Sequence, residues 1–387
     1  MDFALTEEQE MFRSHIRKML DKYEGTQVAR DVILGKRDKL NEVYAKLAEL
    51  GCTAINIPEQ YDGLDLDALD LVPTYEELGR SLVPGLFLET FALVVPLLKK
   101  FGTEQQQKRY FPGIAAGTSW ISFAALEPNA DFSPEGIQCT LEKQGNQYVL
   151  NGMKIAVPEV SQATSFLIIA RTNEQEKDLS LILIDKTDLL EIKKQHSLDE
   201  AKELGSLTFD QFVISEEQII GTINEGWSTL EECLLYFNAA LSSYMVGATE
   251  QIVHMAAEYA KIREQFGQAI GRFQAIKHPI VNMKVDLEIA KSLSYYANWV
   301  LETAEEDRAA TVYSARTTAS KSYVTAAAHN IQIHGGIGFT EEIDCHLYLK
   351  RANYYEQYLG TNTFYEEKIA SSLGWLEEEK QWQELTN

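Results

Sequence analysis

Two segments in the last third of the chain combine residues that could bind an anionic ligand. One reads Arg263-Glu264-Gln265-Phe266-Gly267, followed by Gly271-Arg272-Phe273-Gln274, and the other reads Gln332-Ile333-His334-Gly335-Gly336. An arginine offers a planar fork of charged donors, and paired glycines let another group approach the backbone closely. Taken singly, Arg263 could equally be a surface charge and Gly335-Gly336 an ordinary helix stop.

The overall charge makes a local basic site necessary for any anionic ligand. The 387 residues include 35 Lys and Arg against 58 Asp and Glu, a net charge of -23. Such a surface repels phosphate backbones, so we expect neither nucleic-acid binding nor docking on an anionic membrane. With 45% apolar residues the chain can bury a large core, and no apolar run is long enough to predict a transmembrane helix.

The N-terminus and the cysteines bear on location and on metals. The first residues lack the basic and apolar regions of a signal peptide, so we expect a cytoplasmic protein. Cys52, Cys139, Cys233 and Cys345 are scattered, without a CxxC pair. This spacing fits neither a disulfide framework nor a zinc site.

The hydrophobic pattern changes twice along the chain and predicts three domains in an α+β fold. Residues 1–116 have a helical period and predict an N-terminal helical domain. Residues 117–222 change to period two and predict a middle antiparallel β-barrel domain. Residues 223–387 return to long amphipathic stretches, which predict a C-terminal four-helix bundle. Such a bundle usually completes its burial in an oligomer.

Local signals place several element boundaries. Thr6 with Gln9 predicts a capping box at the first helix, and Pro96 is tolerable only in the first turn of its helix. Gln144-Gly145-Asn146 predicts a hairpin, and Asn151-Gly152 predicts the next turn. The acidic stretch Glu377-Glu378-Glu379 is expected to be solvated charge.

The chain resembles the acyl-CoA dehydrogenase family over essentially its whole length. The resemblance rests on the two motifs, on the α–β–α order and on the run Asn224-Glu225-Gly226-Trp227. The patterns R-x-Q-F-G…GRFQ and Q-x-x-G-G-x-G-F are long and correctly spaced, so the resemblance is specific. It implies the acyl-CoA dehydrogenase fold and an FAD-dependent oxidation of acyl-CoA thioesters.

In this family each FAD lies at a dimer interface, and the retained motifs serve the FAD housed mainly in the neighbouring subunit. The resemblance implies that Arg263 meets the pyrophosphate and that the paired glycines admit the ADP part. His278 and His334 lie within the same motifs and are expected to support the site rather than act as acid or base. The implied cofactor-binding residues are Arg263, Gln265, Phe266, Gln274, Gln332, Gly335, Gly336 and Thr361.

The segments that would hold the chain's own flavin ring depart from the family pattern. Where the family has T-E-P-G-A-G-S-D, this chain reads Leu126-Glu127-Pro128-Asn129-Ala130-Asp131-Phe132-Ser133. Where the family has W-I-T-N, it reads Ala156-Val157-Pro158-Glu159. Leu126, Phe132 and Pro158 each replace a hydroxyl-bearing residue, Ala156 replaces the stacking tryptophan, and the glycines are lost. We therefore expect this subunit not to enclose a flavin ring in the usual way.

The glutamate that removes the substrate α-proton in the family is also missing. The family's Y-E-G-T appears here as Tyr358-Leu359-Gly360-Thr361, and the alternative base position holds Phe237, followed by Asn238. Neither Leu359 nor Phe237 can abstract a proton. Glu356, one helical turn before Leu359, is a candidate for a displaced base, and the tyrosines around it are expected to pack.

This division predicts a subunit of a heteromeric acyl-CoA dehydrogenase, which completes the FAD site of a homologous partner that carries the catalytic glutamate. Family heterotetramers of this kind act on bulky acyl-CoA thioesters, including steroid side chains, which implies lipid metabolism as the setting. Electron-transfer flavoprotein is the expected acceptor. Three alternatives stay open: a homo-oligomeric dehydrogenase that uses Glu356, a flavin monooxygenase, and a non-catalytic scaffold.

Overall fold

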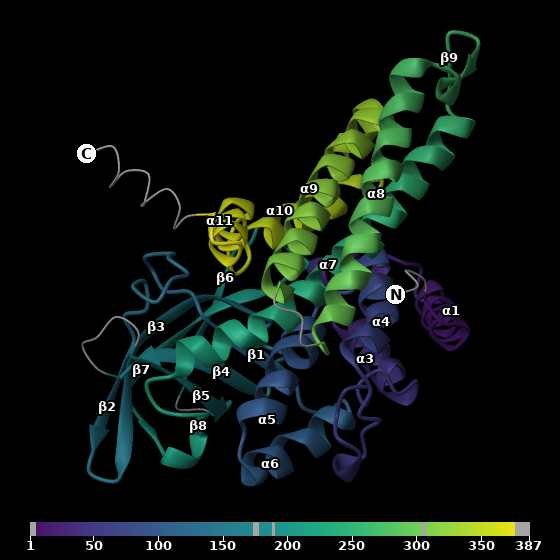
Figure 1. The fold of residues 1–387 in the computed structure, drawn as a ribbon. Coiled ribbons are helices and arrows are strands. Elements are labelled where there is room, and N and C mark those ends of the chain that lie inside the picture. Colours follow the sequence, from purple (N-terminus) through teal and green to yellow (C-terminus); the bar gives the residue numbers. More distant parts are fainter. Residues whose placement is uncertain (1–4, 173–177, 188–189, 304–306, 376–387) are drawn as a thin grey trace, which may run out of the picture. The chain divides into compact units, whose positions relative to one another are not determined.

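The computed structural model describes residues 5–172, 178–187, 190–303 and 307–375 (Figure 1). These residues form two compact units: Met1–Arg30, Ala68–Val83 and Asn238–Asn387 belong to unit 1, and Asp31–Asp67 and Pro84–Phe237 belong to unit 2. No helix of the described ranges is long and apolar enough to cross a membrane. The acidic stretch Glu377–Glu379 lies outside these ranges. The expected boundaries after residues 116 and 222 stay predictions.

Long helices dominate unit 1. α8 packs on α9, and α9 also contacts α10 and α11. A tight turn made of β9 (Glu264–Gln265), β10 (Gln268–Ala269) and a 3-10 turn (Ile270–Arg272) joins α7 to α8, and Figure 1 shows β9 at the end of α8. The helices that lie wholly or partly in unit 1 are α1 (Glu7–Asp21), α2 (Gln27–Ile33), α4 (Ala68–Arg80), α7 (Gly226–Ile262), α8 (Gln274–Val300), α9 (Arg308–His334), α10 (Cys345–Gln357) and α11 (Asn362–Ser372). The capping box of Thr6 and Gln9 is confirmed at α1.

Glycines let α4 and α7 cross with their backbones in contact. A Cβ atom at Gly79 would lie 1.9 Å from the Tyr244 carbonyl oxygen, and one at Gly247 would lie 1.9 Å from the Glu76 carbonyl oxygen. Real Cβ atoms do not approach an oxygen this closely, so any side chain here must push the helices apart. The crossing therefore requires glycine at both positions.

The same crossing buries a carboxylate. Glu76 is fully buried, and its Oε2 lies 3.3 Å from Nη2 of Arg13 on α1. Arg13 is shared, because it also pairs with Glu77 at 3.1 Å and with Glu250 at 2.6 Å. Burial raises the pKa of Glu76 to about 7, although Arg13 and Lys291 oppose the shift. Glu250 and the Tyr295 hydroxyl complete the groups that face it.

This pKa predicts a pH-dependent stability. The folded chain holds a proton on Glu76 that an unfolded glutamate with a pKa near 4.5 releases. The stability from this group is therefore present below about pH 4.5 and is lost as the pH rises towards 7. We expect Glu76→Gln to flatten this decline. Urea unfolding of both proteins at several pH values measures it, and parallel curves for the two proteins would show that Glu76 titrates normally.

Unit 2 joins short helices to a sheet. Its helical elements are α3 (Asp38–Glu49), a 3-10 turn (Glu59–Tyr61), a π-helix (Glu89–Val94), α5 (Val95–Phe101), α6 (Glu104–Ala115) and a 3-10 turn (Glu216–Gln218). Pro96 lies in the first turn of α5, as expected. Thr103 and Gln106 form a second capping box at α6, which sequence reasoning missed.

The sheet has the strand order β6-β7-β3-β2-β4-β5-β8, with β1 paired to β4. Its strands are β1 (Ile121–Ala124), β2 (Thr140–Gln144), β3 (Gln147–Pro158), β4 (Ser165–Arg171), β5 (Leu179–Asp185), β6 (Glu191–Gln195), β7 (Leu204–Ile214) and β8 (Ile219–Ile220). The hairpin at Gly145 is confirmed. The sheet is mixed rather than purely antiparallel, since β1 runs parallel to β4, and the pairing of the described strands does not close into a barrel.

The expected turn at Asn151-Gly152 is wrong. β3 runs through both residues, and its register against β7 shifts between Leu150 and Gly152. Gly152 has φ +131°, and a Cβ there would lie 2.5 Å from the Cys139 sulfur. The glycine therefore marks a bulge with close packing rather than a chain reversal.

Candidate functional site

The turn between α7 and α8 forms a cavity of about 500 Å³ with the end of α9. It lies entirely within unit 1, and we call it the hairpin pocket. Five of the eight implied cofactor-binding residues line it: Arg263, Gln265, Phe266, Gly335 and Gly336. Thus segments about 70 residues apart in sequence meet in one pocket.

Arg263 supplies charge to this pocket. Its side chain is exposed and has neither a hydrogen bond nor an ion pair within the ranges that the structure describes. The other side chains lining the pocket are mostly apolar or aromatic. A free guanidinium beside apolar walls suits a ligand with phosphate oxygens and a flat, weakly polar part.

The two glycines differ in what the fold requires of them. Gly335 ends α9 with φ +64°, a conformation that favours glycine. Gly336 has no such φ, and a Cβ built on it would meet no atom within 4 Å. The chain's own packing gives no reason for glycine at position 336, so the open space is available to another molecule.

Aromatic rings line the rest of the pocket. Phe266 is 92% exposed with φ +53°, and its ring stands edge-on to Phe273 with centroids 6.0 Å apart. Tyr259 and His334 are stacked 4.1 Å apart. His334 Nδ1 donates to the Asn330 carbonyl oxygen at 2.8 Å, and burial lowers the pKa of this histidine. His334 is therefore a neutral packing partner near pH 7, in line with its expected supporting role.

The other residues singled out from the sequence lie apart from the lining. Gln274 and Gln332 are exposed at the start of α8 and in the last turn of α9. Thr361 is the N-cap of α11, and its hydroxyl oxygen accepts from the Phe364 amide at 3.2 Å. Gln265, by contrast, does line the pocket, and its Nε2 donates to the Glu264 carbonyl oxygen at 2.8 Å. Sequence reasoning missed Tyr259, which lines the pocket but lies outside both motifs, whereas Phe273 and Ile333 lie within the motifs but were not assigned as cofactor contacts.

Two family models match the chain, one before and one after the residues that form the sheet. The model of the acyl-CoA dehydrogenase N-terminal domain matches residues 6–118, and that of the acyl-CoA dehydrogenase C-terminal domain matches residues 224–374. The chain belongs to the acyl-CoA dehydrogenase family.

Individual relatives and structures agree with this membership and confirm the fold class. Probable acyl-CoA dehydrogenase YngJ of Bacillus subtilis is 28% identical over 96% of this chain and 100% of its own length. Butyryl-CoA dehydrogenase from Megasphaera elsdenii superposes with a TM-score of 0.89 at 25% identity, over 96% of this chain and 100% of that one. The FAD complex of PigA gives a TM-score of 0.88 at 27% identity, over 97% and 99%.

The first segment that departs from the family pattern is held by a buried ion pair. Lys154 Nζ lies 2.7 Å from Glu127 Oε1, and both side chains are almost fully buried. Glu127 also accepts from the backbone amides of Gln138 and Cys139. Phe132, where the family has serine, is buried and contacts Trp227 with ring centroids 5.7 Å apart. The substitution has put an apolar contact where the family carries a hydroxyl.

The second segment is bent into the interior of unit 2. Ala156 and Glu159 both have positive φ values, +51° and +48°. Glu159 is fully buried, where its Oε2 accepts from both terminal nitrogens of Arg37 at 3.2 Å. Burial raises the pKa of Glu159, with Arg37 and Lys202 opposing. The last residue of this segment thus serves an ion pair within the fold.

Both base positions of the family hold buried apolar side chains. Leu359 is 1% exposed and Phe237 is 0% exposed. The Leu359 carbonyl oxygen accepts from the Tyr365 hydroxyl at 2.6 Å, which fixes this turn. Glu356, the candidate displaced base, is half-buried and accepts from Asn362 Nδ2 at 3.2 Å. Nothing at positions 237 or 359 can take a proton.

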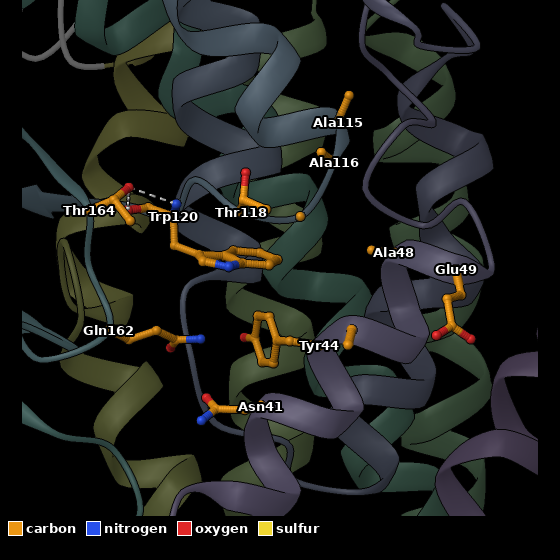
Figure 2. Close-up of a pocket in the computed structure, with 12 residues that line it drawn as sticks. Asn41, Tyr44, Ala48, Glu49, Ala115, Ala116, Thr118, Trp120, Gln162 and Thr164 are labelled. Carbon is orange, nitrogen blue, oxygen red and sulfur yellow. Dashed lines mark hydrogen bonds between the residues drawn. The ribbon is translucent and has the colours of Figure 1, made fainter.

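Unit 2 contains a larger cleft that sequence reasoning missed (Figure 2). It measures about 680 Å³ and lies between α3, the end of α6 and the turn before β4. Figure 2 shows the rings of Trp120 and Tyr44 together in it, 4.4 Å apart and edge to face. The one charged residue among the described lining is Glu49. A cleft without a cation is a poor site for pyrophosphate, so it is no rival to the hairpin pocket.

Proposed function

We propose that this chain is a subunit of a heteromeric acyl-CoA dehydrogenase and completes the FAD site of a homologous partner. The observation that carries the proposal is the contrast between two sets of residues. Arg263 is unpaired beside an open Gly336 in the hairpin pocket. In the two segments that depart from the family's flavin-ring pattern, Phe132 packs on Trp227 and Glu159 pairs with Arg37, both within unit 2.

In this proposal the chain's residues bind and position; they do not react. Arg263 binds the pyrophosphate oxygens, Gly336 admits the ADP part, and Phe266 with Phe273 covers its apolar side. Gln265, Gln274, Gln332, Gly335 and Thr361 are the further cofactor contacts that we assign. Bound FAD supplies the hydride acceptor for oxidation at the acyl β-carbon. The partner supplies the ring pocket and the glutamate that removes the α-proton.

The setting follows from the same proposal. An acyl-CoA thioester is the substrate class, and bulky or steroid side chains are the acyl groups for which heteromeric members of the family divide their residues in this way. Electron-transfer flavoprotein would reoxidise the flavin in the cytoplasm. A tetramer with two flavins rather than four follows, because only the partner holds a flavin ring.

Purification of the chain alone tests the proposal. We expect little bound FAD and no oxidation of acyl-CoA thioesters, because the ring contacts and the base are both missing. The measurement is flavin absorbance per chain, compared with the chain co-expressed with its partner. A yellow lone chain with one flavin per subunit, bleached by substrate, would favour a homo-oligomer that uses Glu356. Full flavin without bleaching by any acyl-CoA would favour a monooxygenase.

Restoring a carboxylate should not be sufficient. We expect Leu359→Glu in the isolated chain to show no dehydrogenation, because the base and a held flavin must lie on opposite sides of the same Cα–Cβ bond. Steady-state reduction of an artificial acceptor by the variant measures this. Turnover by the single variant would mean that Phe132 and Glu159 leave a working ring pocket.

A further inference from the structure

A second basic surface lies on the opposite side of α7 from the hairpin pocket. Here α7, the turn and the start of α8 enclose about 440 Å³, with Ala257, Ala260, Lys261, Arg272, Lys277 and Val281 in the lining. Residues two apart in an α-helix point about 200° apart. Within α7, Lys261 therefore faces away from Tyr259, which lines the hairpin pocket. We call this second surface the basic groove.

The cations of the basic groove are largely unneutralised. Lys261 pairs with Glu258 at 2.5 Å. Arg272 and Lys277 are exposed, and neither side chain has a hydrogen bond or an ion pair within the described part of the chain. In a chain with a net charge of -23, free cations gathered at one cavity are unusual. An anion between them would relieve their mutual repulsion.

The floor of the basic groove is apolar. Cations that were only solvated surface charges would not need an apolar surface beside them. Ala257 and Ala260 form the floor with Val281, which is 52% exposed. Gly271 brings the turn close to α7: a Cβ there would lie 2.9 Å from the Ala260 carbonyl oxygen. This close packing sets Arg272 beside the alanines. Ala260 is already 3% exposed, so a bare inorganic ion would leave chiefly Val281 in water, whereas an anion with an apolar body would cover it.

We propose that the basic groove binds an anion with a short apolar body. The phosphate or carboxylate headgroup lies against Arg272 and Lys277, and the body lies on Ala260 and Val281. The basic groove is distinct from the FAD half-site, because the two surfaces share no lining residue. The proposal for the groove is therefore independent of the proposed FAD role.

Hexyl phosphate and hexanoate are the probes, titrated calorimetrically into the full chain at low salt, and they distinguish the two headgroups. We expect saturable binding of at least one of them, weakened by raising the salt from about 20 mM to about 300 mM. Hexanol and inorganic phosphate should each bind at least tenfold more weakly. Equal binding of hexanol would overturn the role of the cations, and equal binding of inorganic phosphate would overturn the role of the floor.

Variants locate the site. Arg272→Gln with Lys277→Gln should weaken binding tenfold or more, and Val281→Ser about threefold. Arg263→Gln, on the other side of α7, should leave it unchanged. Thermal unfolding checks that each variant is folded. We expect the variants to fold, because the substituted positions are exposed. No binding by the unaltered chain, equal binding by the double variant, or loss of binding with Arg263→Gln would each overturn the proposal.

Discussion

Complexes that carry Arg263→Ala are expected to hold FAD about ten- to 150-fold more weakly than the unaltered complex. The alanine removes a charge-assisted contact to the pyrophosphate, worth on the order of 1.5–3 kcal/mol. The loss should appear as free flavin in another polypeptide's site, since this chain is proposed to give only part of the contacts. The measurement is flavin content and turnover of the co-purified complex at low micromolar concentration, with assembly checked by size.

Lys261→Ala is the matched control for this experiment. It removes a positive charge two residues before Arg263, from a side chain that lines the basic groove and not the hairpin pocket. We expect this variant to retain its FAD. If Arg263→Ala complexes assemble and keep all their flavin, the chain does not complete a site in trans. Equal loss with both variants would point instead to a general effect of charge on assembly.

Lys154→Met is expected to lower the free energy of unfolding by about 3–5 kcal/mol, the usual cost of leaving one partner of a buried ion pair uncompensated. Glu127 would keep its backbone donors from Gln138 and Cys139 but lose its only cation among the described contacts. The expected effect exceeds that of simple packing loss, because methionine nearly matches lysine in volume. Urea unfolding monitored by tryptophan fluorescence measures it.

Two comparisons make the Lys154→Met result specific. Lys193→Met on β6 removes an exposed ion pair with Glu191 and should change stability by less than about 0.5 kcal/mol. Glu127→Gln combined with Lys154→Met should cost less than the two single changes added together, because no lone charge stays buried. A cost below about 1 kcal/mol for Lys154→Met would mean that Glu127 is hydrated or protonated in the folded chain.

Local signals predicted the elements well, and long-range pairings escaped them. The Thr6 capping box, the place of Pro96 and the hairpin at Gly145 each depend on a few neighbouring residues, and all three are confirmed. The parallel pairing of β1 with β4 joins residues about 44 positions apart, so no local period reports it. The turn expected at Gly152 is wrong because an Asn-Gly pair usually signals a turn, whereas glycine also suits a bulge within a strand.

The site residues that belong to sequence motifs could be predicted, whereas those that reach the site only through tertiary packing could not. Arg263 and Gly336 were identified because glycines and arginines at specific spacing carry information in their types. Tyr259 reaches the same pocket only through the geometry of α7. The sequence shows it as an isolated tyrosine in a helix, and this pattern does not predict a pocket position. The ion pair between Arg37 and Glu159 spans 122 positions. This ion pair explains why a charged residue is tolerated at position 159. From the sequence, position 159 could be recognised only as a departure from the family pattern.

Gly247 and Gly336 illustrate that folding and cofactor handling impose separable constraints on this chain. In a library of variants sorted by cellular abundance alone, position 247 should be depleted of every residue but glycine, because a Cβ there collides with the backbone of α4. Position 336 should drift freely under the same selection, because a Cβ there meets nothing. Only sorting for flavin retained by the assembled complex would restore glycine at 336. The two glycines thus separate two requirements, one for a stable chain and one for its proposed service to a neighbour.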